Sequence, residues 1–240
     1  MSRTLNIEKK FMDAFRKLCS SRSSYAVWDD LVTMIACSLS NAQEPDKARF
    51  DAREAMYQDA LKRIGHGDIA VSCFAEILGA FMEDPAQDFL GTVYGLLRIN
   101  SKDKGQFFTP YHVSDMMAKM MLENAKNEIK KKGIITINDP CCGAGSMLIA
   151  AANVLREQEI NYQSHAFFVA QDIDPVVAKM CYIQMSLIGC AGYVLIGNSL
   201  ANPPAGSVLI PDTSQYQDAW FTPMYYLNGY HKIAAKEKAQ

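Results

Sequence analysis

The chain has 240 residues, of which 49% are hydrophobic and 21% charged, as in ordinary globular proteins. The formal net charge is −2, which excludes the strong basic excess of a protein that grips nucleic acid by itself. No apolar run approaches the roughly 20 residues needed to cross a bilayer, and residues 1–10 lack the apolar segment of a signal peptide. We therefore expect a cytoplasmic protein with no membrane contact.

The seven cysteines, at positions 19, 37, 73, 141, 142, 181 and 190, form no C-x-x-C pair, and no histidine lies at ligand spacing to them. An odd number of scattered cysteines predicts reduced thiols, without a disulfide framework and without a metal site. The basic run at residues 130–132 is typical of a solvated helix end, where the helix dipole favours positive charge.

The first part of the chain is predicted to be helical. Apolar residues recur at helical spacing through residues 7–18, 27–39, 55–64, 69–81 and 89–97. Asp68 is the expected N-cap of the helix at 69–81, and Asp84, followed by Pro85, that of the helix at 89–97. Because no motif here carries visible chemistry, we interpret its methionine and aromatic residues as core.

Strands and helices alternate later in the chain. After an amphipathic helix over residues 112–131, the pattern predicts strands at 134–137, 166–170 and 193–196, with helices at 146–157 and 174–188 between them. This order favours a parallel, Rossmann-like sheet. No further strand–helix unit is visible after residue 198. We therefore expect an α/β protein with a helical domain over 1–104 and an incomplete sheet domain over 105–240.

The strongest local motif, Asn138-Asp-Pro-Cys-Cys-Gly-Ala-Gly-Ser146, lies between the first strand and its helix. Ligands of open α/β sheets bind at the carboxyl ends of strands. Gly143 and Gly145 allow a tight turn and close approach of a ligand to the backbone, and Asp139 could accept a hydrogen bond from a ligand ammonium group. The spacing lacks the third glycine of a dinucleotide site and the lysine of a P-loop. A tight turn without a ligand remains the alternative.

Two further segments add to this motif. Asp172 ends the second strand, where a carboxylate typically accepts hydrogen bonds from both ribose hydroxyls; the alternative is an N-cap. Asp174, followed by Pro175, is the better N-cap. The segment Gly105-Gln-Phe-Phe-Thr-Pro110 precedes the helix at 112–131, with Thr109 as its expected capping hydroxyl.

Together, these three segments resemble the cofactor-binding motifs of DNA adenine N6-methyltransferases, in particular the modification subunits of type I restriction-modification systems. The resemblance covers roughly residues 1–200 and implies a shortened member that binds S-adenosylmethionine (SAM) and reaches DNA through a specificity subunit. Homo- and hetero-oligomers both stay open. The resemblance implies that these residues bind the cofactor: Phe108, Thr109, Pro110, Asp139, Pro140, Gly143, Gly145, Asp172, Ile173 and Asn198.

The resemblance also implies particular roles. Thr109 would lie near the methionine carboxylate, Asp172 would bind the ribose hydroxyls and Ile173 would pack on the adenine ring. The family often has Glu in place of Asp172. At the end of the third strand, Asn198 stands where the family usually has Asp, and it keeps the ability to hydrogen-bond an adenine amino group.

The chain departs from the family at the substrate motif, which reads Asn/Asp-Pro-Pro-aromatic after a fourth strand. Here Asn202-Pro203-Pro204 is followed by Ala205, which has no ring to stack on a flipped base. Asn202 also lies only four residues beyond Asn198. Candidate stacking rings elsewhere are Trp220, Phe221, Tyr225 and Tyr226.

The catalytic residues are therefore left unassigned, and two functions stay open. One is a DNA adenine N6-methyltransferase subunit that works with a partner; the other is a non-catalytic SAM-binding or interaction protein derived from such an enzyme. A small-molecule or protein methyltransferase fits the segment 105–110 less well. The glycine spacing disfavours a nicotinamide dehydrogenase.

Overall fold

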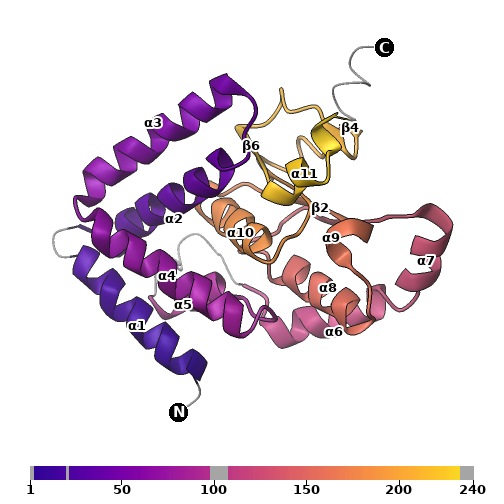
Figure 1. Cartoon of the computed structure of the whole chain (residues 1–240), viewed down its shortest axis with the longest axis horizontal. Helices are drawn as coiled ribbons and strands as arrows, with labels where there is room; N and C mark the ends of the chain where they lie inside the picture. Colours follow the sequence, from indigo (N-terminus) through magenta and orange to yellow (C-terminus); the bar gives the residue numbers. More distant parts are fainter. Residues whose placement is uncertain (1–2, 20–21, 98–107, 233–240) are drawn as a thin grey trace.

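A computed structural model describes residues 3–19, 22–97 and 108–232 of the chain. Its first part is helical, as predicted, and lies on one side of the molecule (Figure 1). Amphipathic stripes and local caps account for these helices: Asp46, for example, accepts a hydrogen bond from the backbone of Arg49 at the start of α3. The helices are α1 (Arg3–Leu18), α2 (Ser24–Asn41), α3 (Lys47–Ile64), α4 (Gly67–Glu83) and α5 (Phe89–Leu96).

The second part is mixed α/β, which confirms the predicted class. Its helices are α6 (Tyr111–Met121), α7 (Ala125–Lys132), α8 (Ser146–Glu157), α9 (Tyr162–His165), α10 (Pro175–Leu187) and α11 (Pro223–Leu227). Its strands are β1 (Ile135–Asp139), β2 (Ala166–Asp172), β3 (Gly192–Ile196), β4 (Gly206–Ser207), β5 (Ile210–Pro211) and β6 (Asp218–Phe221).

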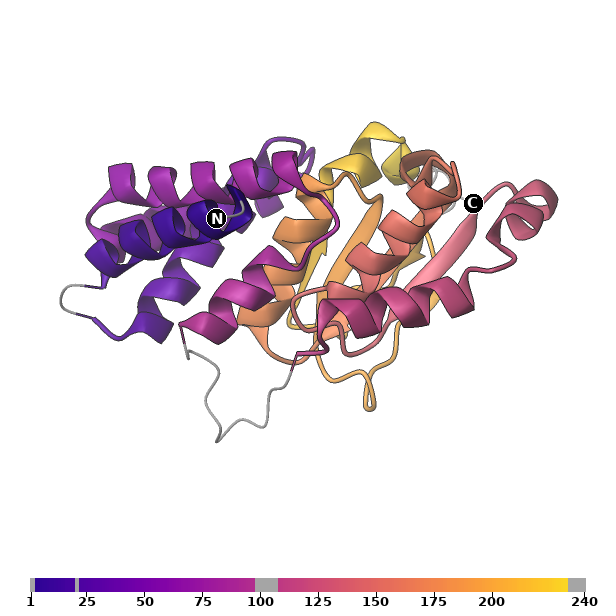
Figure 2. The same cartoon turned by 90° about the horizontal axis from the view of Figure 1, so that it is seen from below.

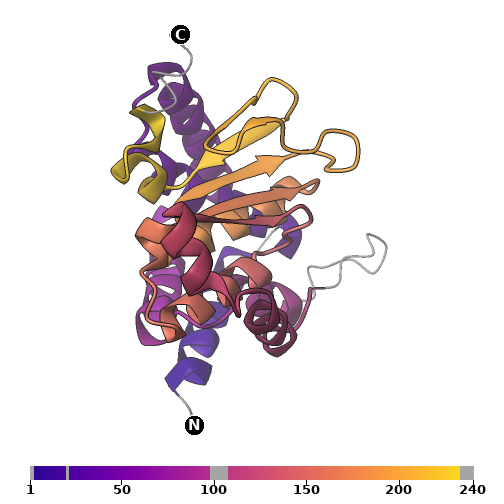
Figure 3. The same cartoon turned by 90° about the vertical axis from the view of Figure 1, so that its right-hand side faces the viewer.

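The main sheet has the strand order β1-β2-β3-β6, and its strands lie side by side in Figure 3. The first three strands are parallel, with Asp139 opposite Ala170 and Asp172 opposite Ile196, so their carboxyl ends meet at one edge. The fourth strand, β6, pairs antiparallel with β3 and was not predicted from the sequence. A short hairpin, β4–β5, lies between them in the chain.

Alternating residues of the strands build two hydrophobic layers, as the period of two requires. Phe168 and Val194 face the layer that contains the buried residues of α8 and α10. Phe167 and Tyr193 face the opposite layer, with Phe221 of β6 and the tyrosines of α11. The strands β2 and β3 are buried on both faces, whereas Thr136 of the edge strand β1 is exposed.

The helical part and the sheet share one continuous core. Helix α10 lies between α2 and the sheet (Figure 2), and Trp28 of α2 packs there with its indole nitrogen 3.4 Å from the sulfur of Met180. Arg53 of α3 binds Asp218 of β6 through both guanidinium nitrogens. The predicted domain division at residue 104 stays a prediction, but side chains from both parts pack in the same cluster.

Three local predictions need correction. The helix expected over residues 112–131 is two helices, α6 and α7, separated at residues 122–124, where Gln158 hydrogen-bonds the carbonyl of Leu122. Helix α4 starts after His66 without a side-chain cap, and Asp68 lies in its first turn. Helix α5 is capped by Asp88 and not by Asp84, so it begins four residues later than the Asp-Pro pair suggested.

Among the described residues, no single helix combines the length and apolar character of a membrane span. Helices α3 and α4 reach that threshold only as a pair, and the pair is bent by 111°.

Candidate functional site

The glycine-rich turn joins the end of β1 to α8 at the carboxyl edge of the sheet. Gly143 and Gly145 have φ values of +53° and +98°, in the left-handed region that favours glycine. A Cβ on Gly145 would also lie 2.9 Å from the Sγ of Cys181, so α10 packs directly against the turn. Both conformation and packing therefore require glycine at position 145, as expected for a turn that lets a ligand approach the backbone.

The described end of the segment 105–110 lies against this turn. A Cβ on Gly143 would be 3.2 Å from the Cδ1 atom of Phe108, whose ring also contacts the ring of Tyr94 at a centroid distance of 5.6 Å. Residues 105–107 lie outside the described residues. Pro110, and not Thr109, takes the N-cap position of α6, and no side chain caps the helix there. The predicted capping role of Thr109 is therefore wrong, and its hydroxyl is not committed to the helix.

The end of β2 is tied to the same turn. Asp172 accepts a hydrogen bond from the backbone nitrogen of Gly143 through Oδ2, at 2.8 Å, and one from that of Asp174 through Oδ1, at 2.9 Å. Asp174 caps α10 by accepting from the backbone of Val176, with Pro175 at the first turn, as predicted. Asp172 is thus not the helix cap; it links two neighbouring strand ends.

A cavity of about 220 Å³ lies where these segments meet. Asp139 and Asp88 both line it, and burial raises the pKa of each carboxyl. Burial likewise raises the pKa of the nearby Asp172. A cavity with carboxyl groups and a helix N-terminus suits a ligand that carries both positive and negative charge. Its lining consists of Asp88, Phe108, Thr109, Met117, Asp139, Cys141, Cys142, Gly143, Ala144, Ser146 and Met147.

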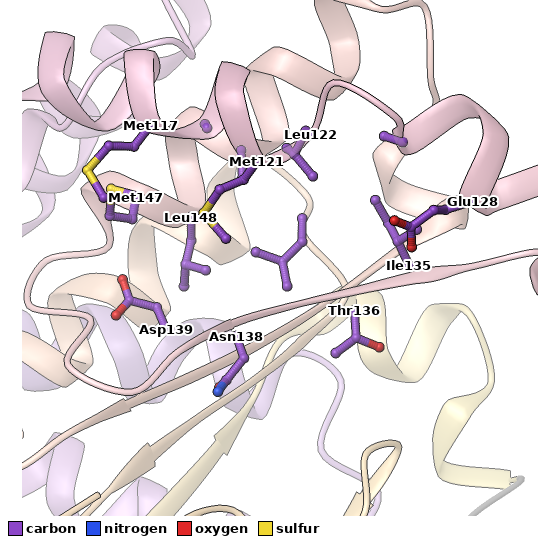
Figure 4. A pocket seen from close by; sticks show the side chains of 14 residues that line it. Met117, Met121, Leu122, Glu128, Ile135, Thr136, Asn138, Asp139, Met147 and Leu148 are labelled. Atoms are coloured by element: carbon purple, nitrogen blue, oxygen red, sulfur yellow. The ribbon is translucent and has the colours of Figure 1, made fainter.

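A second cavity, of about 380 Å³, adjoins the first along β1 and shares Met117, Asp139 and Met147 with it. Figure 4 shows the Asp139 carboxylate below Met147, with Met121 and Leu148 farther along the strand. Residues of α6, α7, β1 and α8 line this second cavity. The Asp139 carboxylate lies at one end of it and the Glu128 carboxylate at the other (Figure 4).

The structure brings some predicted site residues together more closely than others. Phe108, Thr109, Asp139 and Gly143 line the smaller cavity, and Gly145 closes the turn beside it. Pro110 and Pro140 are exposed and do not line it. Ile173, next to Asp172, is 66% exposed.

The loop after β3 approaches the glycine-rich turn from the other side. Ser199 lies near Cys141, with 3.8 Å between Oγ and Sγ. Asn198 is exposed, and its Oδ1 accepts hydrogen bonds from the backbone of Leu200 and Ala201, so this side chain stabilises its own loop.

Comparison with known proteins agrees with this geometry. The family model described as N-6 DNA Methylase matches residues 85–221, more than half of the chain. The chain belongs to the N-6 DNA methylase family. The match covers all ten predicted cofactor residues and also reaches back to α5 in the helical part. A relative, the type I restriction enzyme MpnII methylase subunit of Mycoplasma pneumoniae, is 28% identical over 102 residues, which is 42% of this chain and 17% of the relative.

In this member of the family, two side chains hydrogen-bond to the main chain of the segment Asn202-Pro203-Pro204. Gln171 donates from Nε2 to the carbonyl of Asn202 at 3.0 Å, and the hydroxyl of Tyr216 donates to the carbonyl of Pro203 at 2.9 Å. The stacking rings suggested from the sequence are buried: Trp220 at 1% exposure, and Phe221, Tyr225 and Tyr226 at less than 9%. They belong to the core, because β6 and α11 pack them against the sheet.

Sequence reasoning missed two residues at this edge. Tyr216, half-buried, is the ring next to Asn202-Pro203, but it lies in an irregular segment with no motif. Asp88 lies in the helical region that we interpreted as core from the sequence. The signal that could have identified it is its position directly before α5, where it is the N-cap.

Proposed function

We propose that the chain binds SAM at the cavity formed by the glycine-rich turn, Phe108 and Thr109, with β1–β3, α8 and α10 acting as the corresponding half of a Rossmann-like methyltransferase sheet. The observation that carries the proposal is the hydrogen bond from the Gly143 nitrogen to Asp172, because it brings the turn and the end of β2 together. Phe108 packs on the same glycine, so three segments distant in sequence form one site.

The residues present fit the chemistry of this cofactor. The smaller cavity offers carboxyl groups for the ammonium group of the methionine end, while the N-terminus of α8 and the exposed Thr109 hydroxyl suit its carboxylate. We expect Asp172 to accept hydrogen bonds from the ribose hydroxyls and the exposed side chain of Ile173 to contact the base. When bound, SAM supplies an activated methyl group on its sulfonium sulfur.

We propose further that the acceptor is the N6 amine of adenine in DNA, within a restriction-modification system in the cytoplasm. Family membership supports this substrate class. The relative named above is a methylase subunit of a type I restriction enzyme, and this chain spans 17% of its length. With a net charge of −2, the chain has little electrostatic attraction for DNA. We therefore propose that a specificity subunit supplies most of the DNA contact.

Two measurements test the proposal in order. Calorimetric titration with SAM should give saturable binding, and Asp172→Ala should weaken it. Transfer of labelled methyl groups should then appear on DNA that contains adenine once a specificity subunit is added. No binding at roughly millimolar SAM, equivalent to less than about 4 kcal/mol of binding free energy, would refute the cofactor site in this chain.

A second candidate, a SAM-binding protein that does not transfer methyl groups, is favoured by one observation. The Pro203 carbonyl, placed in the motif where the family accepts the substrate amine, already accepts the Tyr216 hydroxyl. Because a carbonyl oxygen has two lone pairs, a substrate amine would have to share this oxygen with the Tyr216 hydroxyl or displace it. The catalytic candidate requires one of these two arrangements, and the binding candidate requires neither.

Two substitutions separate these functions. Tyr216→Phe frees the Pro203 carbonyl and keeps the ring, so it should preserve or raise methyl transfer if the loop accepts the substrate. Asn202→Ala should abolish that transfer while SAM binding persists. If neither the wild type nor Tyr216→Phe transfers methyl groups in the presence of DNA and a specificity subunit, the non-catalytic function stands.

A further inference from the structure

Asp88, from the helical part of the chain, contributes a carboxylate to the proposed cofactor cavity. The residue is 6% exposed, and its side chain lines the smaller cavity together with Asp139. Position 88 is far from the three motifs in sequence. Its place in the cavity depends on the packing of α5 against α10, since both helices belong to the shared core.

A buried glutamine holds Asp88 in position relative to the glycine-rich turn. The Gln184 Nε2 donates both to Oδ1 of Asp88, at 2.8 Å, and to the carbonyl of Ala144, at 2.7 Å. Its Oε1 accepts from the backbone nitrogen of Leu90 at 3.0 Å. This pattern assigns the amide orientation, because one end meets two acceptors and the other a donor. Asp88 and the turn are therefore fixed to the same rigid side chain.

The N-cap role of Asp88 does not require a charge. Its Oδ1 accepts the backbone N–H of Gly91 at 2.9 Å, a contact that Asn or Ser could also make. Among the described residues, no Lys, Arg or His pairs with this carboxylate. A buried carboxylate without a cation is unfavourable, and burial accordingly raises the pKa of Asp88. A neutral cap would avoid this cost, and a positively charged ligand in the cavity would offset it.

We infer that Asp88 binds the ammonium group of the methionine end of SAM. This inference rests on the proposed cofactor site. The ammonium group is the suitable cation because it carries N–H donors for charge-assisted hydrogen bonds to a carboxylate, whereas a sulfonium sulfur has none. Through Asp88, the helical part of the chain makes the cofactor site selective for a ligand that carries an ammonium group.

The test compares two ligands in the full chain: S-adenosylhomocysteine and its analogue in which hydrogen replaces the amino group. Asp88→Asn keeps the oxygen that caps α5 but removes the charge. We expect it to weaken S-adenosylhomocysteine binding by about tenfold or more. Binding of the deaminated analogue should stay within about twofold, the range of an unchanged contact. Asp84→Asn, an exposed Asp four residues earlier, is the matched control and should change neither affinity.

Each outcome decides the inference. Equal losses for both ligands would show a structural role for Asp88, and no loss for either would show no role; both overturn it. If Asp88→Asn fails to fold, as judged by its thermal transition without ligand, Asp88→Ser provides an uncharged cap with the same expected pattern. If the wild-type chain binds neither SAM nor S-adenosylhomocysteine, the proposed function itself fails, which distinguishes that failure from a wrong role for Asp88 alone.

Discussion

Asp172 at the end of β2 and Gly143 in the turn after β1 are joined by a 2.8 Å hydrogen bond from the glycine nitrogen to Oδ2. The other carboxylate oxygen accepts from the backbone of Asp174. Both oxygens therefore organise the site without a ligand. Each still has a free lone pair for a hydroxyl group, so the same carboxylate is suited both to holding the turn and to binding a diol.

Replacing Asp172 by alanine should weaken SAM binding by about 10- to 100-fold, since hydrogen bonds to a charged group contribute roughly 1.5–3 kcal/mol. Calorimetry measures the change. Asp51→Ala, on an exposed face of α3, removes an equal charge far from the cavity and should leave the affinity unchanged. An Asp172→Ala variant that binds SAM as tightly as the wild type would remove this carboxylate from the site.

Gly145→Ala should destabilise the fold more than Gly65→Ala. Both glycines have positive φ, at +98° and +70°, so both substitutions incur backbone strain of about 1–2 kcal/mol. Only at Gly145 would the new Cβ also meet Cys181, whereas nothing lies within 4 Å of the corresponding position at Gly65. Thermal unfolding measures the difference.

We attribute the extra loss of stability in Gly145→Ala to the contact between the new Cβ and Sγ of Cys181. In the Cys181→Ala background the Sγ contact is gone, so the additional cost of Gly145→Ala should shrink while the backbone strain remains. Equal midpoints for the Gly145 and Gly65 variants would contradict the packing argument.

The thermal stability of the ligand-free protein should depend on pH because of its buried carboxyl groups. Burial raises the pKa of Asp139 in the folded state. A raised folded pKa gives a favourable contribution that is fully present below the unfolded value of about 3.9 and is lost as pH rises through the folded value. Asp139→Asn, which has no charge to bury, should therefore raise the unfolding midpoint near pH 7 while weakening SAM binding.

The advantage of the Asp139→Asn variant should decrease as pH falls from 7 toward 4, because the wild-type carboxyl becomes protonated. Differential scanning calorimetry of both proteins across that range checks the sign. An advantage that is constant with pH would indicate that burial of the charge is not its cause.

Arg53→Ala should lower the free energy of unfolding more than any surface substitution on α3, because Arg53 joins the helical part to the sheet. The Arg53 guanidinium binds Asp218, donates to the carbonyl of Ala219 at 3.1 Å and stacks on the ring of Trp220, 3.4 Å from its centroid. Removing one partner of a buried pair costs about 3–5 kcal/mol. Lys62→Ala on the same helix, where the lysine is 75% exposed, should cost less than about 0.5 kcal/mol. Denaturant unfolding distinguishes the two.

Much of the local structure follows from short-range pattern. Helix α8 has the predicted bounds of residues 146–157, and Asp174 caps α10 with Pro175 behind it. Because periodicity and helix capping depend on residues close together in the chain, the sequence alone predicts them. The helix predicted over 112–131 is interrupted at residues 122–124, where the carbonyl of Leu122 accepts a hydrogen bond from Gln158, 36 residues along the chain.

The sequence by itself determined the helical and α/β parts, the parallel order of the first three strands, and the motifs at their carboxyl ends. Only the tertiary structure decided that β6 closes the sheet antiparallel to β3, that Tyr216 occupies the Pro203 carbonyl, and that Asp88 enters the cavity. The physical reason is that a buried contact depends on which surfaces pack together. Asp88 reaches the glycine-rich turn through Gln184, 96 residues away, and no local pattern records a partner at that distance.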